Sequence, residues 1–201
     1  MYKNLEKYQG IIFDMDGTLI DTMPAHLTAW AKTAQHFGFP FTKEWLHSLG
    51  GMPSFKIAAE VNANHGMTLD PAEVSRYKMA AFAELDEHGS NIDCTVEVLN
   101  YFNGQKKLAV GTGSQRESAI RLLTKAKLIE QFHAVVTATD VENHKPNPDT
   151  FLKAAELLDL KPQECVVFED TLLGLQAAHS AEMDCVLVEE GELKFYPCPR
   201  Q

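Results

Sequence analysis

The sequence predicts an α/β protein, a doubly wound parallel sheet into which an all-helical cap domain is inserted. Two observations predict the sheet: short apolar runs typical of buried parallel strands recur along the chain, and from Leu108 onward they alternate with helical patterns. A third predicts the cap, because residues 23–92 carry helix signals but no strand-like run. We therefore expect residues 1–22 and 93–201 to form the core and residues 23–92 to form a cap after the first strand.

Five apolar runs are expected to form the strands of the sheet. The helices between them are predicted from apolar residues three or four positions apart, as in Phe151, Ala155 and Leu158. Strands and helices that alternate at this spacing imply right-handed crossovers between parallel strands. Residues 189–201 show no such pattern and are expected to be a surface tail. The expected strands are Gly10–Phe13, Leu108–Gly111, Ala134–Thr137, Cys165–Phe168 and Cys185–Val188.

Proline and capping signals place two helices in the cap. Pro24 suits the first turn of a helix, and Gly38 is placed to end it. Asp70 and Pro71 are typical of a second helix start, and Glu73 adds an acid at the third position. Helices inserted at this point would lie over the core as a lid.

Composition excludes several classes of protein. The 18 Lys and Arg residues are outnumbered by 28 Asp and Glu, and the net charge of −10 disfavours attraction to nucleic acid or to an anionic membrane. The four cysteines form no CxxC pair and are expected to be reduced thiols. The first ten residues do not resemble a secretion signal, and no apolar run approaches the ~20 residues of a membrane span. We therefore expect a cytoplasmic, monomeric protein.

Two carboxylates lie two positions apart directly after the first expected strand, in the motif DMDGT. Side chains two positions apart on a strand point to the same face, so Asp14 and Asp16 would lie together and would need a cation. Gly17 permits a sharp turn after them, and Thr18 adds a hydroxyl group. An Asp-Gly pair is also a common hairpin turn, and this is the alternative.

A second motif, GTGS, follows the second expected strand. Thr112, Gly113 and Ser114 offer hydroxyl and amide donors just before a helix, an arrangement that suits phosphate binding. Ser114 together with Glu117 also matches a capping box, and the two roles can coexist.

Two further motifs follow the third and fourth strands: HKPNPD contains Lys145, and FED contains Glu169 and Asp170. Taken singly, the lysine would be exposed and the acids would complement a helix dipole. Because parallel strands end at one edge, where open α/β sheets bind ligands, we expect all four motifs to meet there. Carboxylates for a hard cation, an ammonium group and hydroxyl donors are the components of a magnesium-dependent phosphoryl-transfer site.

In this order, DMDGTLID, TGS, KPNPD and FED resemble the motifs of the haloacid dehalogenase superfamily, whose core is Rossmann-like. The helical insertion after the first motif resembles the β-phosphoglucomutase-like branch. The resemblance implies that Asp14 is a nucleophile that forms an aspartyl-phosphate, and that Asp16 protonates the leaving alcohol and then activates water. It also implies that Mg²⁺ is bound by the carboxylates of Asp14 and Asp170 and by the backbone carbonyl of Asp16, with Glu169 supporting the metal ligands.

The resemblance further implies that the transferring phosphate is bound by one ammonium group and by the donors of the second motif. These groups would offset the negative charge that gathers on the phosphate oxygens. The residues concerned are Thr112, Gly113, Ser114 and Lys145.

Three cap residues bear on the choice of substrate. His26 matches a histidine that mutase-like relatives place near Asp16. β-Phosphoglucomutase holds a second phosphate with an arginine, and Ser54 stands at that position here, with Lys56 nearby as a substitute charge. This departure favours a phosphatase of small phosphorylated sugars, of the fructose-1-phosphate phosphatase type. The alternatives are a β-phosphoglucomutase that interconverts β-glucose 1-phosphate and glucose 6-phosphate, and a catalytically silent binding protein.

Overall fold

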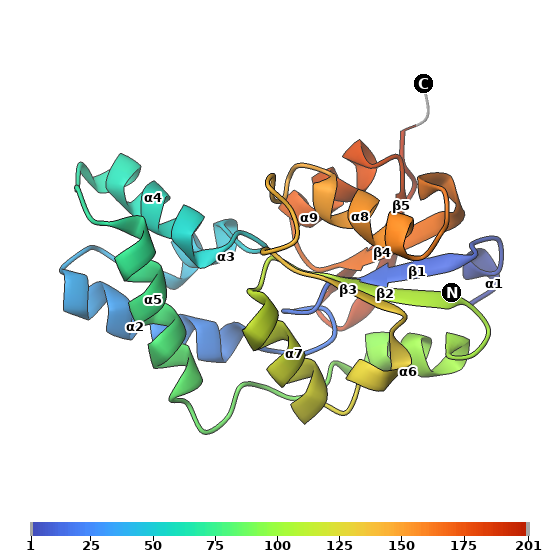
Figure 1. The fold of residues 1–201 in the computed structure, drawn as a ribbon, viewed down its shortest axis with the longest axis horizontal. Coiled ribbons are helices and arrows are strands. Elements are labelled where there is room, and N and C mark those ends of the chain that lie inside the picture. The colour runs from blue at the N-terminus through green and yellow to red at the C-terminus, as the bar shows by residue number, and fades with distance from the viewer. Residues whose placement is uncertain (1, 200–201) are drawn as a thin grey trace.

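The computed structural model describes residues 2–199, and its core is a six-stranded sheet between two layers of helices (Figure 1). Strands β1 to β5 are parallel, and β6 is antiparallel to β5. All of β1 is buried at the centre of the sheet, so the residues that follow it lie in the middle of the carboxyl edge. In the order β3-β2-β1-β4-β5-β6, the strands are β3 (Ala134–Val136), β2 (Lys107–Gly111), β1 (Gly10–Phe13), β4 (Cys165–Glu169), β5 (Asp184–Glu189) and β6 (Glu192–Tyr196).

Helices α6 (Asp93–Phe102) and α7 (Arg116–Lys125) cover one face of the sheet, and α8 (Asp149–Leu157) and α9 (Leu172–Ser180) cover the other (Figure 1). Alternate residues of β1 serve the two layers: Ile11 and Phe13 pack in the cluster with α6 and α7, and Ile12 packs in the cluster with α8 and α9. A short helix, α1 (Tyr2–Leu5), precedes β1. Within the described residues, no helix is both long and apolar enough to cross a membrane.

The expected parallel strands are confirmed to within one residue at each end. Each of the five apolar runs forms a strand of the sheet, and helices connect β2 to β3, β3 to β4 and β4 to β5 as the spacing predicts. Unbroken apolar runs identify these strands because both faces of the sheet are covered.

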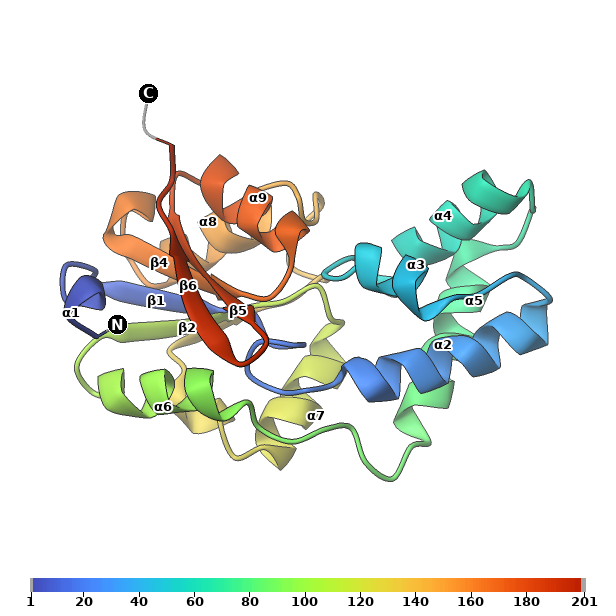
Figure 2. The ribbon, with the colours of Figure 1, turned by 180° about the vertical axis from the view of Figure 1, so that it is seen from behind.

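The prediction of a surface tail at residues 189–201 is wrong. β6 lies within this segment and forms a hairpin with β5 at the edge of the sheet (Figure 2). Glu190 and Gly191 make the turn, with φ angles of 51° and 81°, as a two-residue hairpin with twisted strands requires. Leu193 and Phe195, two positions apart, pack against the core. The last two residues of the predicted tail lie outside the described residues.

Four helices follow β1 and pack together beside the carboxyl edge of the sheet (Figures 1 and 2). They share a hydrophobic cluster of their own around Trp30 and Val74. Gly38, with a φ of 72°, follows the first of them, and the Asp70 side chain accepts the backbone N–H of Ala72 at the start of the last, both as predicted. The boundaries of a separate cap domain stay a prediction. The helices are α2 (Met23–Phe37), α3 (Lys43–Ser48), α4 (Ser54–His65) and α5 (Pro71–Ala83).

The two linkers between these helices and the sheet lie side by side. The Asp21 N–H donates to the Ser90 carbonyl at 2.9 Å, and the Ile92 N–H donates to the Leu19 carbonyl at 2.9 Å. Gly89 has a φ of 121°, and a Cβ there would overlap the carbonyl oxygen of Asp21. The pairing of the linkers therefore requires a residue without a side chain at position 89.

We expect Gly89→Ala to lower the free energy of unfolding by about 2 to 4 kcal/mol, because it adds a steric overlap to an unfavourable backbone conformation. Gly104→Ala is the matched control, since Gly104 has a φ of 75° but open space around it. In Gly104→Ala, the free energy of unfolding should fall only by the cost of the left-handed backbone conformation, about 1 to 2 kcal/mol. Urea denaturation measures both, and equal losses in the two variants would contradict the role of the linker contact.

Candidate active site

The predicted motifs meet at a cavity of about 630 Å³ between the carboxyl edge of the sheet and helices α2 to α5. Asp14, Asp16 and Asp170 line its floor on the core side. Trp30 and Met79 belong to the opposite wall, which is largely apolar. The cavity thus joins an acidic floor to a wall contributed by the cap helices.

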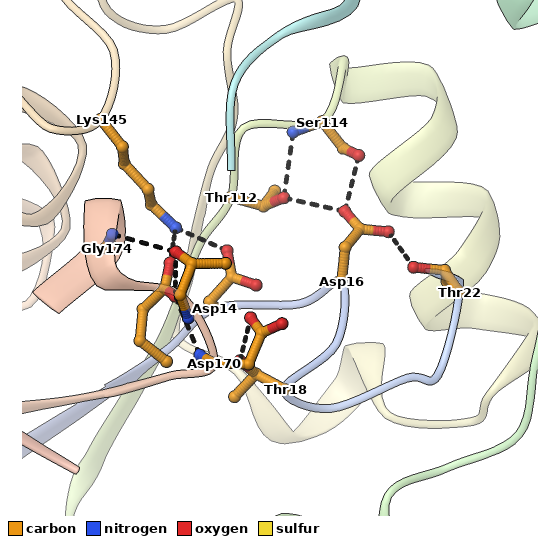
Figure 3. Close-up of polar contacts among 11 residues, drawn as sticks. Asp14, Asp16, Thr18, Thr22, Thr112, Ser114, Lys145, Asp170 and Gly174 are labelled. Carbon is orange, nitrogen blue, oxygen red and sulfur yellow. Dashed lines mark hydrogen bonds and ion pairs between the residues drawn. The ribbon is translucent and has the colours of Figure 1, made fainter. Parts of the chain in front are cut away.

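Lys145 is buried and links the motifs that follow β1 and β4 (Figure 3). Its Nζ donates to Asp14 Oδ1 at 2.6 Å and to Glu169 Oε1 at 2.7 Å. Burial alone would lower the pKa of Lys145, but Asp14 and Glu169 raise it above its ordinary value, so the ammonium form is held. Only 1% of the side chain is exposed, which excludes the alternative of a solvent-facing lysine.

Glu169 is fixed by the start of α9. Its Oε2 accepts the backbone N–H groups of Asp170 at 2.9 Å and Thr171 at 2.7 Å, and the Thr171 hydroxyl at 2.8 Å. Thr171, rather than either acid, occupies the N-cap position of α9. A Cβ at Gly174 would overlap the Glu169 carboxylate, so the helix can approach this acid only with a glycine there.

Three acids form a group that could hold a metal ion: Asp14, Glu169 and Asp170 bring carboxylate oxygens within 4.8 Å of one another. Two like charges at that distance repel by roughly 3 kcal/mol at an effective dielectric of about 20. Lys145 neutralises one charge, which leaves a surplus of two negative charges when all three acids are ionised. Mg²⁺ fits this group in charge and in its preference for carboxylate oxygens.

The surplus charge affects the pKa of the acids themselves. Burial raises the pKa of Asp14 well above its ordinary value, and Glu169 and Asp170 add to the shift although Lys145 opposes it. Burial likewise raises the pKa of Asp170 to about 8, with Glu169 adding to the shift, while the Thr18 hydroxyl donates to Asp170 Oδ1 at 3.3 Å. A cation at this position would favour the ionised forms and so oppose both shifts.

Asp16 lies outside this group and has a separate set of hydrogen bonds (Figure 3). Its Oδ1 accepts the Thr22 hydroxyl at 2.6 Å, and its Oδ2 accepts the hydroxyls of Ser114 at 2.7 Å and Thr112 at 3.3 Å. Burial alone would raise the pKa of Asp16, but hydrogen bonds from His26, Thr22 and Ser114 hold it well below its ordinary value. Asp16 is therefore held as a carboxylate.

Asp14 and Asp16 line the same cavity, although not through the strand alternation that the sequence suggests. β1 ends at Phe13, so both acids lie in the turn that follows, where Gly17 has a φ of 84°. β1 pairs in parallel with β2 and β4, so the Asp-Gly pair does not close a hairpin between neighbouring strands. The turn separates the two carboxylates, which gives each its own partners.

The loop after β2 faces both the floor and the cap. The interpretation of Ser114 and Glu117 as a capping box is wrong, because Gln115 occupies the N-cap position of α7. A Cβ at Gly113 would overlap the carbonyl oxygen of Gly51, which belongs to the loop between α3 and α4. The glycine at 113 thus lets the cap approach the predicted phosphate-binding loop.

His26 and Lys78, both from the cap helices, extend the network around Asp16. His26 Nε2 lies 3.2 Å from Asp16 Oδ1, and Lys78 Nζ lies 2.8 Å from His26 Nδ1. An ammonium group can only donate, so Nδ1 accepts and Nε2 carries the ring proton toward Asp16. Burial lowers the pKa of His26, as does Lys78, and burial lowers the pKa of Lys78 to about 8 although Asp16 opposes that shift.

Two residues of this network are not predicted from the sequence. Lys78 lies on the buried stripe of α5 with Val74 and Ala81, so a charged residue at an apolar helical position was the available signal. Thr22 occupies the N-cap position of α2, where a hydroxyl normally caps the helix, yet its side chain bonds Asp16 instead. Nothing in the sequence indicates that Thr22 bonds Asp16 rather than the backbone of the helix.

The two other predicted cap residues differ in position. Ser54 lines the cavity, and its hydroxyl donates to the Met79 sulfur at 3.8 Å. Lys56 is not among the described residues that line the cavity. The substitute charge suggested by the sequence is therefore not part of this wall.

A family profile of haloacid dehalogenase-like hydrolases matches residues 11–188, a range that contains all four motifs. The chain belongs to the haloacid dehalogenase-like hydrolase family. The predicted resemblance is thereby confirmed, and the protein is an enzyme of this hydrolase family.

Several relatives of this hydrolase have names that describe an activity. The fructose-1-phosphate phosphatase YqaB of Escherichia coli strain K12 is 40% identical over 181 residues, which cover 90% of this chain and 96% of that protein. The β-phosphoglucomutase of Bacillus subtilis strain 168 is 31% identical over 92% of this chain and 84% of that protein. Among solved structures, a hydrolase from Pseudomonas syringae has a TM-score of 0.83 at 26% identity, with 91% of this chain and 85% of that chain covered.

The raised pKa of Asp170 predicts a stability effect in the hydrolase treated with a metal chelator. The folded pKa is about 8 against an ordinary value of 3.8, so between these values ionisation opposes folding more as the pH rises. Asp170→Asn should therefore raise the melting temperature by about 5 °C or more at pH 8, and by little at pH 4. Thermal unfolding measures the difference. Glu87→Gln, at an exposed acid, is the control and should change neither value; a loss of stability in Asp170→Asn at pH 8 would contradict the charge-surplus argument.

Proposed function

We propose that this hydrolase is a magnesium-dependent phosphatase of small sugar phosphates, such as fructose 1-phosphate, that works through an aspartyl-phosphate on Asp14. One observation carries the proposal: two acids two positions apart in the sequence face the same cavity from different environments. Asp14 lies with Lys145 and the acid group, whereas Asp16 lies among hydroxyl donors. The 40% identity to a protein named as a fructose-1-phosphate phosphatase supports the class of substrate.

Asp14 supplies the nucleophile. One of its carboxylate oxygens forms a bond to phosphorus, while the bond between phosphorus and the leaving oxygen breaks and leaves its electron pair on that oxygen. Lys145, which donates to Asp14 Oδ1, fixes the orientation of the carboxylate. Water then attacks the aspartyl-phosphate and restores Asp14 with release of phosphate.

Asp16 moves the proton: it gives one to the leaving oxygen in the first half-reaction and takes one from water in the second. Thr112 and Ser114 each have a single hydroxyl hydrogen, which they donate to Asp16 Oδ2. A bound phosphate that accepts these hydrogens would release Oδ2, and the loss of both donors would raise the pKa of Asp16. Substrate binding would therefore favour the protonated acid at the step that needs it.

Asp14 and Asp170, through their carboxylates, and Asp16, through its backbone carbonyl, are the residues that we propose hold Mg²⁺, with Glu169 in support. When bound, Mg²⁺ supplies positive charge that offsets the repulsion between a carboxylate nucleophile and a phosphate dianion. The surplus of negative charge in the acid group supports this assignment.

A β-phosphoglucomutase is the second candidate, because the enzyme of that name from Bacillus subtilis is 31% identical. A mutase must hold a second phosphate. Among the described lining residues, however, Lys78 is the only lysine or arginine, and its charge already balances that of Asp16, to which it is linked through His26. The wall of the cavity therefore favours hydrolysis over mutase chemistry.

We expect the wild-type protein to release phosphate from fructose 1-phosphate, to lose this activity in the presence of a chelator and to regain it with Mg²⁺. Asp14→Asn should reduce phosphate release to the level of the buffer. Asp16→Asn should slow fructose 1-phosphate hydrolysis by about 10² to 10⁴-fold, but 4-nitrophenyl phosphate hydrolysis much less, because that leaving group needs no proton. Turnover that is insensitive to the chelator, or sugar isomers formed with a bisphosphate primer, would exclude the proposal.

Lys78→Met should lower kcat for fructose 1-phosphate by roughly tenfold, because a buried His26 Nδ1 would lose its hydrogen-bond donor. Lys78→Gln keeps a donor without the charge and should recover part of the loss. The contribution of Lys78 should also fade as the pH rises through about 8, where its ammonium group deprotonates. Rate–pH profiles of the three proteins test this, and identical profiles would show that Lys78 does not support Asp16.

A further inference from the structure

Ser54 is a buried polar group with a poor partner. It is 9% exposed and lines the cavity at the first residue of α4. Its hydroxyl donates to the sulfur of Met79 at 3.8 Å, and a thioether is a weak acceptor. An oxygen acceptor that entered the cavity would therefore take this hydrogen at little cost.

Gln115 is a second residue on the same cavity whose polar side chain is available to bind a ligand. It occupies the N-cap position of α7, yet its side chain caps no backbone N–H. No hydrogen bond of this amide to any described residue is present, although the neighbouring Ser114 hydroxyl is bonded to Asp16. Because Gln115 directly follows the loop that is proposed to bind phosphate, a group attached to that phosphate would lie within its reach.

Among the described residues, the rest of the cap wall is apolar, apart from His26 and Lys78, which bond each other, and the exposed His47 and Ser48. A second anionic group on the substrate would leave water with Lys78 as its only lysine or arginine among the described lining residues, and the charge of Lys78 already balances that of Asp16, to which it is linked through His26. A sugar or polyol matches the wall better, since its C–H groups pack on apolar side chains while its hydroxyls donate and accept. The apolar lining residues contributed by the cap include Trp30, Leu46, Met52, Ile57 and Met79.

We propose that Ser54 and Gln115 select the substrate by hydrogen bonds to the hydroxyls of an uncharged polyol leaving group. This inference rests on the proposed phosphatase function and deepens it: the substrate class is the monophosphate of a small polyhydroxylated alcohol. The Ser54 hydroxyl belongs to the cap and the Gln115 amide belongs to the core, so both sides of the cavity would bind the same leaving group.

Two esters separate recognition of the leaving group from phosphate chemistry: fructose 1-phosphate, which has hydroxyls, and phenyl phosphate, which has none. Ser54→Ala and Gln115→Leu should each raise KM for fructose 1-phosphate by about 3 to 10-fold, the usual effect of a lost neutral hydrogen bond, and should leave KM for phenyl phosphate unchanged. The double variant should multiply the two effects, since the residues bind different hydroxyls.

Ser48→Ala is the matched control. Ser48 also lines the cavity from the cap, but its hydroxyl already donates to the Trp45 carbonyl at 2.6 Å. We expect KM for both esters to stay at the wild-type value in this variant. Should Ser54→Ala fail to fold, Gln115→Leu carries the test alone, because Gln115 lies outside the helix that it precedes.

The outcomes are distinct. Equal rises in KM for both esters, or no change for fructose 1-phosphate, would overturn the inference while the phosphatase proposal stands. A higher kcat/KM for fructose 1,6-bisphosphate than for fructose 1-phosphate would overturn the claim of an uncharged leaving group. If the wild-type protein hydrolyses neither monophosphate ester in the presence of Mg²⁺, the proposed function itself fails.

Discussion

The site depends on one buried ammonium group that bonds two of three neighbouring carboxylates. Lys145 bonds Asp14 and Glu169, and Asp170 completes the group. This surplus of negative charge opposes folding when no cation is bound, yet it lies at the ends of β1 and β4, whose residues are all buried. Burial of the apolar residues of these two strands contributes free energy of folding that offsets the repulsion among the acids. The same burial disfavours the ionised acids, so a bound cation would stabilise them strongly.

The two acids of the first motif are separated by their surroundings rather than by distance along the chain. Burial raises the pKa of Asp14, and the neighbouring acids raise it further. Asp16, in contrast, accepts hydrogen bonds on both of its carboxylate oxygens. Because β1 ends before either acid, the turn can direct one toward Lys145 and the other toward the loop after β2. These shifts are the reverse of what a nucleophile and a proton carrier require. A cation beside Asp14 would lower its pKa, and a bound phosphate that takes the hydroxyl donors of Asp16 would raise the pKa of Asp16.

Sequence patterns predicted the part of the structure that local rules determine. Apolar runs predicted the five parallel strands, because a strand covered on both faces has to be apolar throughout. β6 was missed because an edge strand alternates, and its two inward residues, Leu193 and Phe195, are too few to indicate a strand. Lys78 was missed because its partner, His26, is distant in the sequence, and only tertiary packing brings the two together.

The cap helices do more than cover the cavity, since they contribute two members of the Asp16 network. His26 from α2 bonds Asp16, and Lys78 from α5 bonds His26, with the cap lying against the core where Gly51 meets Gly113. A displacement of the cap would remove the histidine donor from Asp16 and admit water to the cavity beside Asp14 at the same time. The geometry therefore couples enclosure of the cavity to the hydrogen bonding of Asp16, the proposed proton carrier, and both depend on the paired linkers beside Gly89.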